Sequence, residues 1–420
     1  AEKVIEQHRL QEANTIFEAF REIGIDWKPG ESPQDLQLQV AVKLSDGETL
    51  MAGASQQVVI EVTNTGDAVY QLSAVTRSGN NWLDRREFYF GALKSGETRS
   101  FGQRVTLQDG YGTEIAPLYI QFRTPDNPQA FEHTALIRTQ GKELPRFAYT
   151  TRIIDDGTGK SRGNGDGRAD VGEIVDLEVS VTNLGKGPSG EAFVRVKNRS
   201  GRALDLTDGG MFLGEPTEEG LDCDDPDTCP RVLEPGDTFA ARVTFELRSE
   251  PEDGAWKLDL MVGDNRAYDY TTITRAGFYD YFLLEETLEM KPGQPLDDHL
   301  RQPPLIEVTR SPEIQIDTPH SVVSGLVSDD RAVRDVIVFH GSMSQATGTP
   351  LLEQDKIFYQ GGDASTRSLP FTAERSLEPG TNLFIILARD LDGLTATRTI
   401  GTWYEQPRTE AAGAGSERPG

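Results

Sequence analysis

The stretch from Asp155 to Glu173 holds the residues best suited to chemistry in this chain. It reads DDGTGKSRGNGDGRADVGE, and three short patterns overlap within it. The letters GKS at 159–161 are similar to the end of a nucleotide-binding loop. Residues 159–163 fit G-x-S-x-G, the pattern around a hydrolase nucleophile. The polar and glycine-rich residues 164–173 match most of a calcium loop. Each pattern predicts a different kind of protein.

The first two patterns lack the elements that their chemistry needs. A nucleotide loop has a glycine five residues before its Gly-Lys pair, where this chain has Ile154, and it opens a helix. A nucleophile elbow also places its serine between a strand and a helix, whereas an alternating strand pattern follows Glu173. The histidines that could activate a serine are scattered singly, at His8, His133, His299, His320 and His340. We therefore expect neither an ATPase nor a hydrolase.

The calcium pattern D-x-[DN]-x-[DN]-G-x5-E fits better when Gly167 takes the place of its turn glycine. The first position is Arg162 rather than an aspartate, so Asp155 or Asp156 is expected to supply the missing carboxylate. The remaining predicted ligands are Asn164, Asp166, the backbone carbonyl of Arg168, Asp170 and Glu173. Hard oxygen donors at these intervals suit Ca²⁺. The ion would be structural, and it would fix how the second domain meets the first. The alternative is a solvated acidic hairpin whose glycines serve only turns.

The chain has two cysteines, Cys223 and Cys229, in the acidic stretch GLDCDDPDTCPR. A disulfide between them would close a short exposed loop, which suits an oxidising compartment. Two free surface thiols are the alternative. The spacing is not a zinc pattern, and no histidine is close in the sequence.

Composition narrows the class of protein. The chain has 420 residues with a net charge of −26, of which 36% are hydrophobic and 26% charged. Such a charge repels a phosphate backbone, so we expect no nucleic-acid partner. The apolar runs are too short to span a bilayer, so we expect no transmembrane segment. The chain opens at Ala1 without a signal-peptide pattern, which predicts a processed product or an excised fragment.

Hydrophobic periodicity predicts an all-β chain of tandem immunoglobulin-like sandwiches after one short helix. Apolar residues in 1–23 recur at helical spacing, and Gly24 and Ile25 form a predicted C-cap. From residue 36 onward the apolar residues alternate, which is typical of strands with one buried and one wet face. The predicted units are a helix and linker at 1–32, sandwiches at 33–142, 143–290 and 305–404, a linker at 291–304 and a disordered tail at 405–420.

An internal repeat supports this division. The stretch VVIEVTNTGDAVYQLSAVT at 58–76 is similar to LEVSVTNLGKGPSGEAFVRV at 177–196. The stretch LKSGETRSFGQRVTL at 93–107 is similar to LEPGDTFAARVTFEL at 233–247. Two copies of a strand, a Thr-Asn-x-Gly turn and a second turn-strand unit predict two related sandwiches.

These segments together resemble a known family. The stretch 155–185 resembles the calcium loop and strand of bacterial immunoglobulin-like domains appended to secreted proteases. With 58–100, SGLVSDDRAVRDVIVFHG at 324–341, KIFYQGG at 356–362 and 369–400, the chain resembles the C-terminal region of a bacterial carboxyl-terminal-processing (tail-specific) serine peptidase. That family has a PDZ domain and a Ser/Lys catalytic core. Neither is found in this sequence, so no catalytic residue is carried over.

The resemblance implies a non-catalytic accessory region of a serine peptidase in the periplasm or outside the cell. Its partners would be an upstream peptidase core and a protein substrate or envelope protein, and its role recognition or placement. The alternative is a free-standing adhesion or carbohydrate-binding protein. That role would use exposed aromatics, for which the candidates are Trp82, Trp256, Tyr268, Tyr270, Phe278, Tyr279, Tyr281 and Phe282.

Overall fold

The computed structural model describes residues 15–107, 111–216, 231–264, 283–342 and 353–406. Within them the chain is almost entirely β, with one helix at 15–22 and one 3-10 turn, η1 (Gly201–Ala203). The strands form three successive sandwiches, each with its own apolar core. The predicted fold class, tandem immunoglobulin-like sandwiches after a short helix, is confirmed.

The first sandwich pairs a sheet of order β1-β3-β6 with one of order β2-β8-β7-β4-β5. Only its β2–β8 pair is parallel. Its strands are β1 (Leu38–Leu44), β2 (Thr49–Met51), β3 (Ser55–Asn64), β4 (Val69–Arg77), β5 (Glu87–Leu93), β6 (Thr98–Thr106), β7 (Ile115–Arg123) and β8 (Phe131–Gln140).

The second sandwich has two four-stranded sheets, of order β12-β16-β10-β9 and β13-β11-β17-β18, with a small β14-β15 ribbon. Its strands are β9 (Phe147–Ile154), β10 (Ile174–Asn183), β11 (Ala192–Asn198), β12 (Leu204–Leu206), β13 (Gly210–Phe212), β14 (Glu215–Pro216), β15 (Arg231–Val232), β16 (Thr238–Leu247), β17 (Trp256–Asp264) and β18 (Leu283–Met290).

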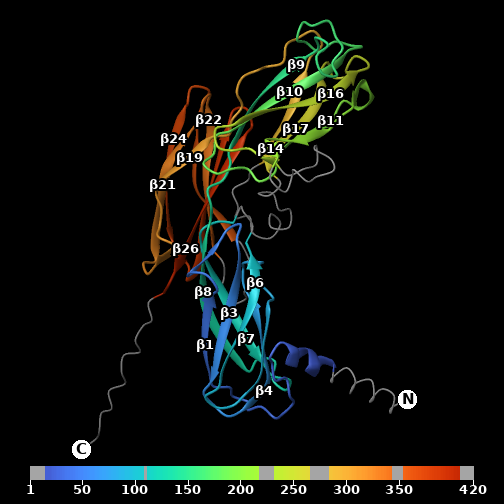
Figure 1. Cartoon of the computed structure of the whole chain (residues 1–420). Helices are drawn as coiled ribbons and strands as arrows, with labels where there is room; N and C mark the ends of the chain where they lie inside the picture. The colour runs from blue at the N-terminus through green and yellow to red at the C-terminus, as the bar shows by residue number, and fades with distance from the viewer. Residues whose placement is uncertain (1–14, 108–110, 217–230, 265–282, 343–352, 407–420) are drawn as a thin grey trace, which may run out of the picture.

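The third sandwich repeats the three-plus-five plan of the first, with sheets of order β19-β21-β24 and β20-β26-β25-β22-β23. Its strands are β19 (Leu305–Arg310), β20 (Gln315–Ile316), β21 (His320–Ser328), β22 (Val333–Ser342), β23 (Glu353–Gly361), β24 (Ser368–Ser376), β25 (Gly380–Asp390) and β26 (Thr395–Tyr404). In Figure 1 the first sandwich lies below the other two, which stand side by side above it.

The cores contain the alternating residues that the sequence singles out. In each predicted strand these side chains point to one face and are at most 1% exposed. They are Val58, Ile60 and Val62 in β3, Leu118, Ile120 and Phe122 in β7, and Val175, Leu177, Val179 and Val181 in β10. Burial of these apolar faces is the main source of stability for each sandwich.

The opposite face of β10 corrects the expectation of a wet face. Asp176 is 1% exposed and Glu178 is 7% exposed. Glu178 is covered by Arg152 of β9 and Arg242 of β16, whose guanidinium groups lie 2.6 and 3.0 Å from its carboxylate oxygens. β10 is an inner strand, so its polar residues have neighbours on both sides that can cover them and satisfy their charge.

The repeated Thr-Asn-x-Gly turn makes the same contacts in both copies. Asn64 of the first sandwich is 2% exposed and its Nδ2 donates to Leu93 O at 3.1 Å. Asn183 of the second is 0% exposed and its Nδ2 donates to Leu233 O at 2.9 Å. Each asparagine thereby joins the two segments of its repeat, so the repeated sequence is a repeated structure.

The N-terminal helix docks on the first sandwich through the segment that follows it. Gly24 has φ +79, and Ile25 N donates to Phe20 O at 2.8 Å, which confirms the predicted C-cap. Ile25 is 4% exposed, and Phe20 stacks on Trp27 with ring centroids 4.4 Å apart. The part of the predicted helix at 1–14 lies outside the described residues. In the described part of the chain no helix is long and apolar enough to cross a membrane.

Candidate functional site

The predicted calcium loop connects two adjacent strands of one sheet. β9 ends at Ile154 and β10 begins at Ile174, so Asp155 and Glu173 flank the two strand ends. A short bridge between Arg162 and Ile174 brings the middle of the loop back to β10. The two outer carboxylates consequently converge. A Cβ added to Gly163 would lie 2.7 Å from Asp155 Cβ and 2.9 Å from Glu173 Oε1.

Asp155 is the anchor of this loop. Its side chain is 1% exposed, and its two oxygens accept hydrogen bonds from three backbone N–H groups. Gly165 N and Asp166 N donate to Oδ2 at 2.8 and 3.0 Å, and Gly167 N donates to Oδ1 at 2.9 Å. A buried carboxylate is tolerable with such charge-assisted bonds. Asp155 therefore folds the glycine-rich stretch around itself.

The other predicted ligands also receive backbone N–H groups. Glu173 Oε1 accepts from Asn164 N at 2.9 Å, and Asp166 Oδ1 accepts from Arg168 N at 3.0 Å. Asn164 Oδ1 accepts from Asp166 N at 2.9 Å, so the loop is a series of Asx turns. Near its start, Asp156 Oδ1 accepts from Thr158, which holds the pKa of that exposed carboxyl below its usual value.

The donor chemistry of the loop suits a hard cation, because every predicted ligand is a carboxylate, an amide or a carbonyl oxygen. The described residues nevertheless include no group of three or more His, Cys, Asp or Glu side chains placed to hold a metal ion. The carboxylates of Asp155, Asp156, Asp166 and Glu173 accept backbone N–H groups of the loop. Ca²⁺ binding by Asp155, Asp156, Asn164, Asp166, Arg168, Asp170 and Glu173 stays a prediction.

The serine and lysine of the two competing patterns serve the same loop. Ser161 is 2% exposed, donates from Oγ to Thr158 O at 2.7 Å and accepts from Gly157 N at 3.2 Å. Lys160 Nζ lies 2.6 Å from Asp208 Oδ2. Ser161 is thus a turn residue whose hydroxyl is engaged with backbone, and β10 rather than a helix follows the loop.

The loop also contacts the linker at 291–304. Gly293 N donates to Ala169 O at 3.2 Å, and Arg168 Nη1 donates to Gly293 O at 3.0 Å. A further bridge joins Arg168 to Pro295. Ala169 is 1% exposed and belongs to the second core. The linker that these contacts hold leads to the third sandwich. The expectation that an ion in the loop fixes the second sandwich against the first stays a prediction.

The far end of the linker pairs with β9 through one isolated β-bridge. Arg301 N donates to Tyr149 O at 2.8 Å and Tyr149 N donates to Arg301 O at 2.9 Å. The Arg301 guanidinium lies 2.8 Å from Glu286 Oε2 of β18, and the Tyr149 hydroxyl also donates to Glu286. Arg301 is 5% exposed, so this end of the linker is held in the folded structure.

The third sandwich reaches the second core with one side chain. Leu394, in the turn between β25 and β26, is 3% exposed and packs within the apolar cluster of the second sandwich. Beside it, Arg331 Nη1 lies 2.8 Å from His299 Nε2 and 3.2 Å from Asp392 Oδ1. The third sandwich therefore contacts the second through an apolar side chain and the linker through a polar cluster.

The first and third sandwiches also touch. A Cβ added to Gly401 of β26 would lie 3.4 Å from Glu114 Cβ, just before β7.

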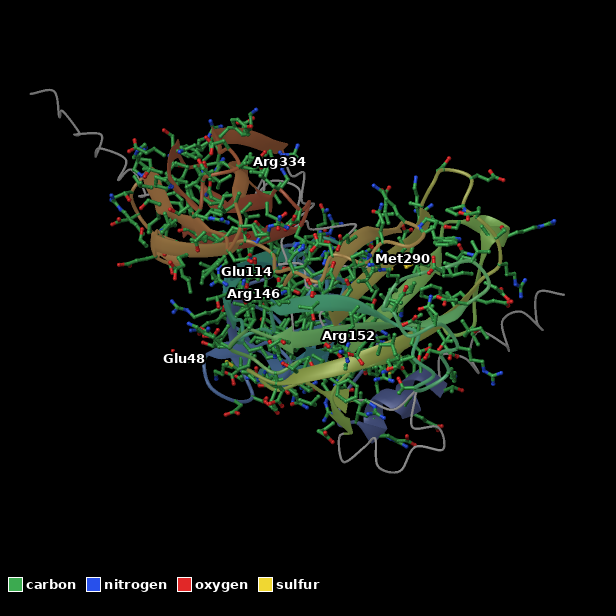
Figure 2. All side chains as sticks on the ribbon, turned by 90° about the horizontal axis from the view of Figure 1, so that it is seen from above. Glu48, Glu114, Arg146, Arg152, Met290 and Arg334 are labelled. Carbon is green, nitrogen blue, oxygen red and sulfur yellow. The ribbon has the colours of Figure 1, made fainter. Side chains whose placement is uncertain are left out.

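Arg146 Nη1 donates to Pro303 O at 3.1 Å, which ties the start of the second sandwich to the end of the linker. Figure 2, seen from above, shows the third sandwich with Arg334 beside the second sandwich with Arg152 and Met290.

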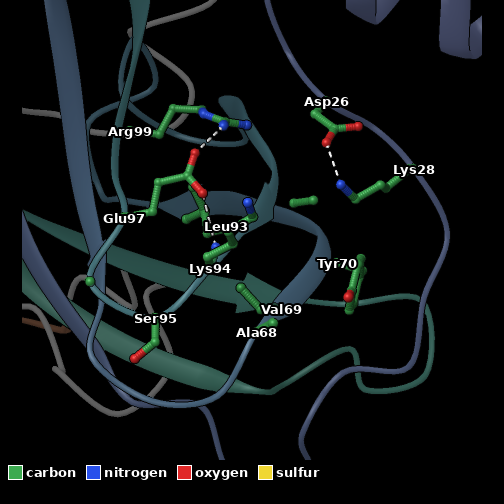
Figure 3. Close-up of a pocket in the computed structure, with 12 residues that line it drawn as sticks. Asp26, Lys28, Ala68, Val69, Tyr70, Leu93, Lys94, Ser95, Glu97 and Arg99 are labelled. Carbon is green, nitrogen blue, oxygen red and sulfur yellow. Dashed lines mark hydrogen bonds and ion pairs between the residues drawn. The ribbon is translucent and has the colours of Figure 1, made fainter.

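An open hollow of about 590 Å³ lies on the first sandwich between the segment at 26–28 and the turn from β5 to β6 (Figure 3). Two ion pairs line it, Lys28 with Asp26 at 2.8 Å and Arg99 with Glu97 at 2.7 Å. Lys94 also lines the hollow, so its charged side chains are three cations and two carboxylates, with one net positive charge.

The predicted disulfide and the candidate aromatic residues remain to be placed. Cys223 and Cys229 lie outside the described residues, as do the aromatic candidates between Tyr268 and Phe282. Trp256 is 0% exposed and belongs to the second core, and Trp82 packs partly buried against the first. Neither described tryptophan presents the exposed ring that a carbohydrate site would use.

Sequence comparison places the chain in no family. No protein-family model matches it, and no curated protein matches it either. The fold and the loop define its class: a string of immunoglobulin-like β-sandwich domains with an acidic, glycine-rich loop at one strand connection.

Solved structures with similar β-domains share little sequence with the chain. They include red sea bream transglutaminase (14% identity, 59% of this chain and 31% of that one, TM-score 0.20). The fibronectin(III)-like modules of Clostridium thermocellum CbhA match at 13% identity over 61% and 96%, with a TM-score of 0.20. Dimeric latent PorU from Porphyromonas gingivalis matches at 11% over 88% and 34%, with a TM-score of 0.22. The chain spans about a third of the transglutaminase and of PorU, and none of the three bears on its function.

Proposed function

We propose that this chain is a non-catalytic binding and placement region that holds three β-sandwiches in one fixed arrangement. The observation that carries the proposal is the burial of the linker and of Leu394. Domains that move independently would expose the residues between them, whereas here Arg301 is 5% exposed and Leu394 is 3% exposed. A rigid array presents its surfaces at set distances, which favours recognition of an extended partner such as a protein chain.

The finer proposal follows the resemblance of the sequence. The chain would be the accessory region of a serine peptidase in the periplasm or outside the cell, and it would place protein substrates or an envelope partner relative to the peptidase core. The docked helix supports this placement role, because Phe20, Trp27 and Tyr89 pack together and so fix the direction from which the chain enters the first sandwich.

Mass spectrometry of the native protein tests the finer proposal. We would isolate the protein from its own cell envelope and measure its intact mass and its peptides. A mass tens of kilodaltons above that of this chain, with peptides that carry a Ser/Lys catalytic core, is the expected result. A native chain of this length alone would contradict it and would favour a free-standing adhesion protein.

We further propose that the loop at 155–173 binds Ca²⁺ as a structural ion. A cation near Asp156, Asp166 and Asp170 would offset the mutual repulsion of the loop's carboxylates. Asp155 and Glu173 retain lone pairs beyond those that the backbone N–H groups use. The ion would stiffen the loop and, through Arg168 and Gly293, the start of the linker.

Thermal unfolding tests this ion. Saturating Ca²⁺ should raise the melting temperature of the wild type, by mass action on the folded state, and a chelator should reverse the rise. Asp166→Ala should shrink the response, whereas the control Asp253→Ala, at a side chain 77% exposed in another turn, should leave it intact. Equal melting temperatures with and without Ca²⁺ for the wild type would remove the ion from the account.

A further inference from the structure

The turn between β25 and β26 joins the cores of two sandwiches. Leu394 inserts into the second core, although the strands on either side of it belong to the third. The shape of the turn depends on Asp390, whose Oδ1 accepts from Leu394 N at 2.7 Å while its N–H donates to Leu394 O at 3.1 Å. The carboxyl group of Asp390 therefore holds the residue that docks the two sandwiches.

Asp390 has an unusual environment for a carboxylate. It is 2% exposed, and no described Lys or Arg lies within ion-pair distance of it. Its neighbours include two more carboxylates, Asp329 in the turn from β21 to β22 and Asp392 in its own turn. Asp329 Oδ2 is itself buried and accepts no hydrogen bond within the described residues. Three acidic groups thus gather where the sandwiches meet.

The cations around this turn are engaged with other groups. Arg331 binds Asp392 and His299, Arg301 binds Glu286, and Arg146 binds Pro303 O. The titratable and charged groups that face the turn come from every element packed against it. They are Asp329, Asp330, Arg331 and Asp392 of the third sandwich, His299 and Arg301 of the linker, and Arg146, Tyr149 and Glu286 of the second sandwich.

We propose that this turn is a proton-sensitive latch: a protonated Asp390 keeps Leu394 docked in the second sandwich, and an ionised Asp390 loosens the contact between the two sandwiches. A neutral carboxyl can lie beside Asp329 and Asp392 without repulsion and can still accept from Leu394 N. An ionised Asp390 would be a buried charge without an ion-pair partner among the described Lys and Arg residues, beside the carboxylates of Asp329 and Asp392, which is unfavourable.

The direction of the pH response follows from the two states. Burial raises the pKa of Asp390 from 3.8 to about 7, and burial also raises the pKa of Asp329. In an undocked turn Asp390 would be solvated and titrate near its ordinary value. Docking is therefore strongest below about pH 4, weakens by up to about tenfold per pH unit as the pH rises toward 7, and is weakest above that.

Hydrogen exchange of the full chain tests the latch. Protection of the Leu394 and Arg301 amides would be measured at about pH 5.5 and about pH 8, in chelator to exclude divalent cations, with intrinsic exchange rates divided out. We expect wild-type protection at Leu394 to fall by roughly tenfold or more at the higher pH. Asp390→Asn keeps the acceptor without the charge, so its protection should stay high at both.

Three further variants make the result specific. Asp317→Asn removes an exposed carboxylate of the same sandwich and should respond like the wild type. His299→Gln should also keep the response, since the latch depends on Asp390. Leu394→Ala should show low protection at Arg301 at both pH values. The proposal would be overturned if Leu394 protection did not fall at the higher pH in the wild type, or if it fell as much in Asp390→Asn. Loss of the pH-dependent fall in His299→Gln would also overturn it.

Discussion

At the scale of single residues, buried carboxylates at strand ends organise the turns of this chain. Asp155 follows β9, Asp264 ends β17 and Asp390 ends β25, and each is at most 2% exposed. Each accepts backbone N–H groups from a neighbouring loop, among them Gly190 N and Glu191 N on Asp264 at 2.7 and 3.0 Å. Backbone donors that would otherwise be unsatisfied are paired in this way.

Such roles are only partly visible in the sequence. The sequence predicts Asn164, Asp166 and Glu173 as calcium ligands, which stays a prediction; in the structure their side-chain oxygens accept backbone N–H groups of the loop. That Asp155 would bind three N–H groups could not be predicted, because a carboxylate at a loop start can bind an ion or the backbone equally well. The choice depends on how the chain folds back over Gly163, which no local pattern encodes.

Glu114 gives a prediction at this scale. Burial raises its pKa from 4.5 to about 7, while the Tyr111 hydroxyl that donates to it acts in the opposite direction. The folded chain thus prefers the protonated form, and its free energy of unfolding should fall as the pH rises from about 4.5 to about 7. Glu114→Gln removes the charge, so this variant should be more stable than the wild type at pH 8.

Urea unfolding at two pH values measures this difference. Below about pH 4.5, where Glu114 is protonated in both states, the wild type and Glu114→Gln should have similar free energies of unfolding. Glu48→Gln, at an exposed carboxylate of the same sandwich, is the control. If Glu114→Gln were no more stable than the wild type at pH 8, burial would not disfavour the ionised form of Glu114.

At the scale of elements, alternation and turn signals were enough to identify most strands. The strands β3, β7 and β10 contain the predicted apolar faces. Successive side chains of a strand point to opposite faces, so apolar residues at every second position lie on one face. The repeat also corresponds to one structure, since Gly96 N donates to Asn64 O and Gly236 N to Asn183 O, both at 2.7 Å. The buried polar face of β10 was missed, because Arg152 and Arg242 come from other strands.

The segment at 25–32 gives a prediction for elements. Asp26 O accepts from Ala92 N at 2.7 Å, and a Cβ at Gly91 would lie 2.4 Å from that oxygen. Gly91 has φ +71, a conformation that disfavours alanine. Gly91→Ala should therefore push the segment off β5 and lower the free energy of unfolding by the strain of the backbone and by the clash.

Gly96→Ala is a matched control, because Gly96 has φ +77 with nothing within 4 Å of an added Cβ. Both variants share the backbone strain of about 1–2 kcal/mol. The clash at Gly91 should add about 1–3 kcal/mol in chemical unfolding. Equal losses for the two variants would mean that the segment is not held against the first sandwich.

At the scale of the whole molecule, the junctions lie in segments that the sequence suggests are only connections. The linker at 291–304 is rich in proline and charge, yet Arg301 is buried in it and pairs with β9. Leu394 stands in the polar turn RDLDGLT, and nothing in that pattern assigns it to the core of another sandwich. Tertiary contacts of this kind depend on the placement of whole sheets. The three separate cores agree with three predicted sandwiches, whose boundaries stay a prediction.

Small-angle X-ray scattering of the full chain at about pH 6 tests the fixed arrangement of the three sandwiches most directly. The account predicts that one arrangement of the three sandwiches, that of Figure 1, accounts for the wild-type scattering. Leu394→Ala should shift it toward a more extended average, because the side chain that joins two cores is cut back. Wild-type scattering that requires sandwiches moving independently, unchanged in Leu394→Ala, would contradict the account.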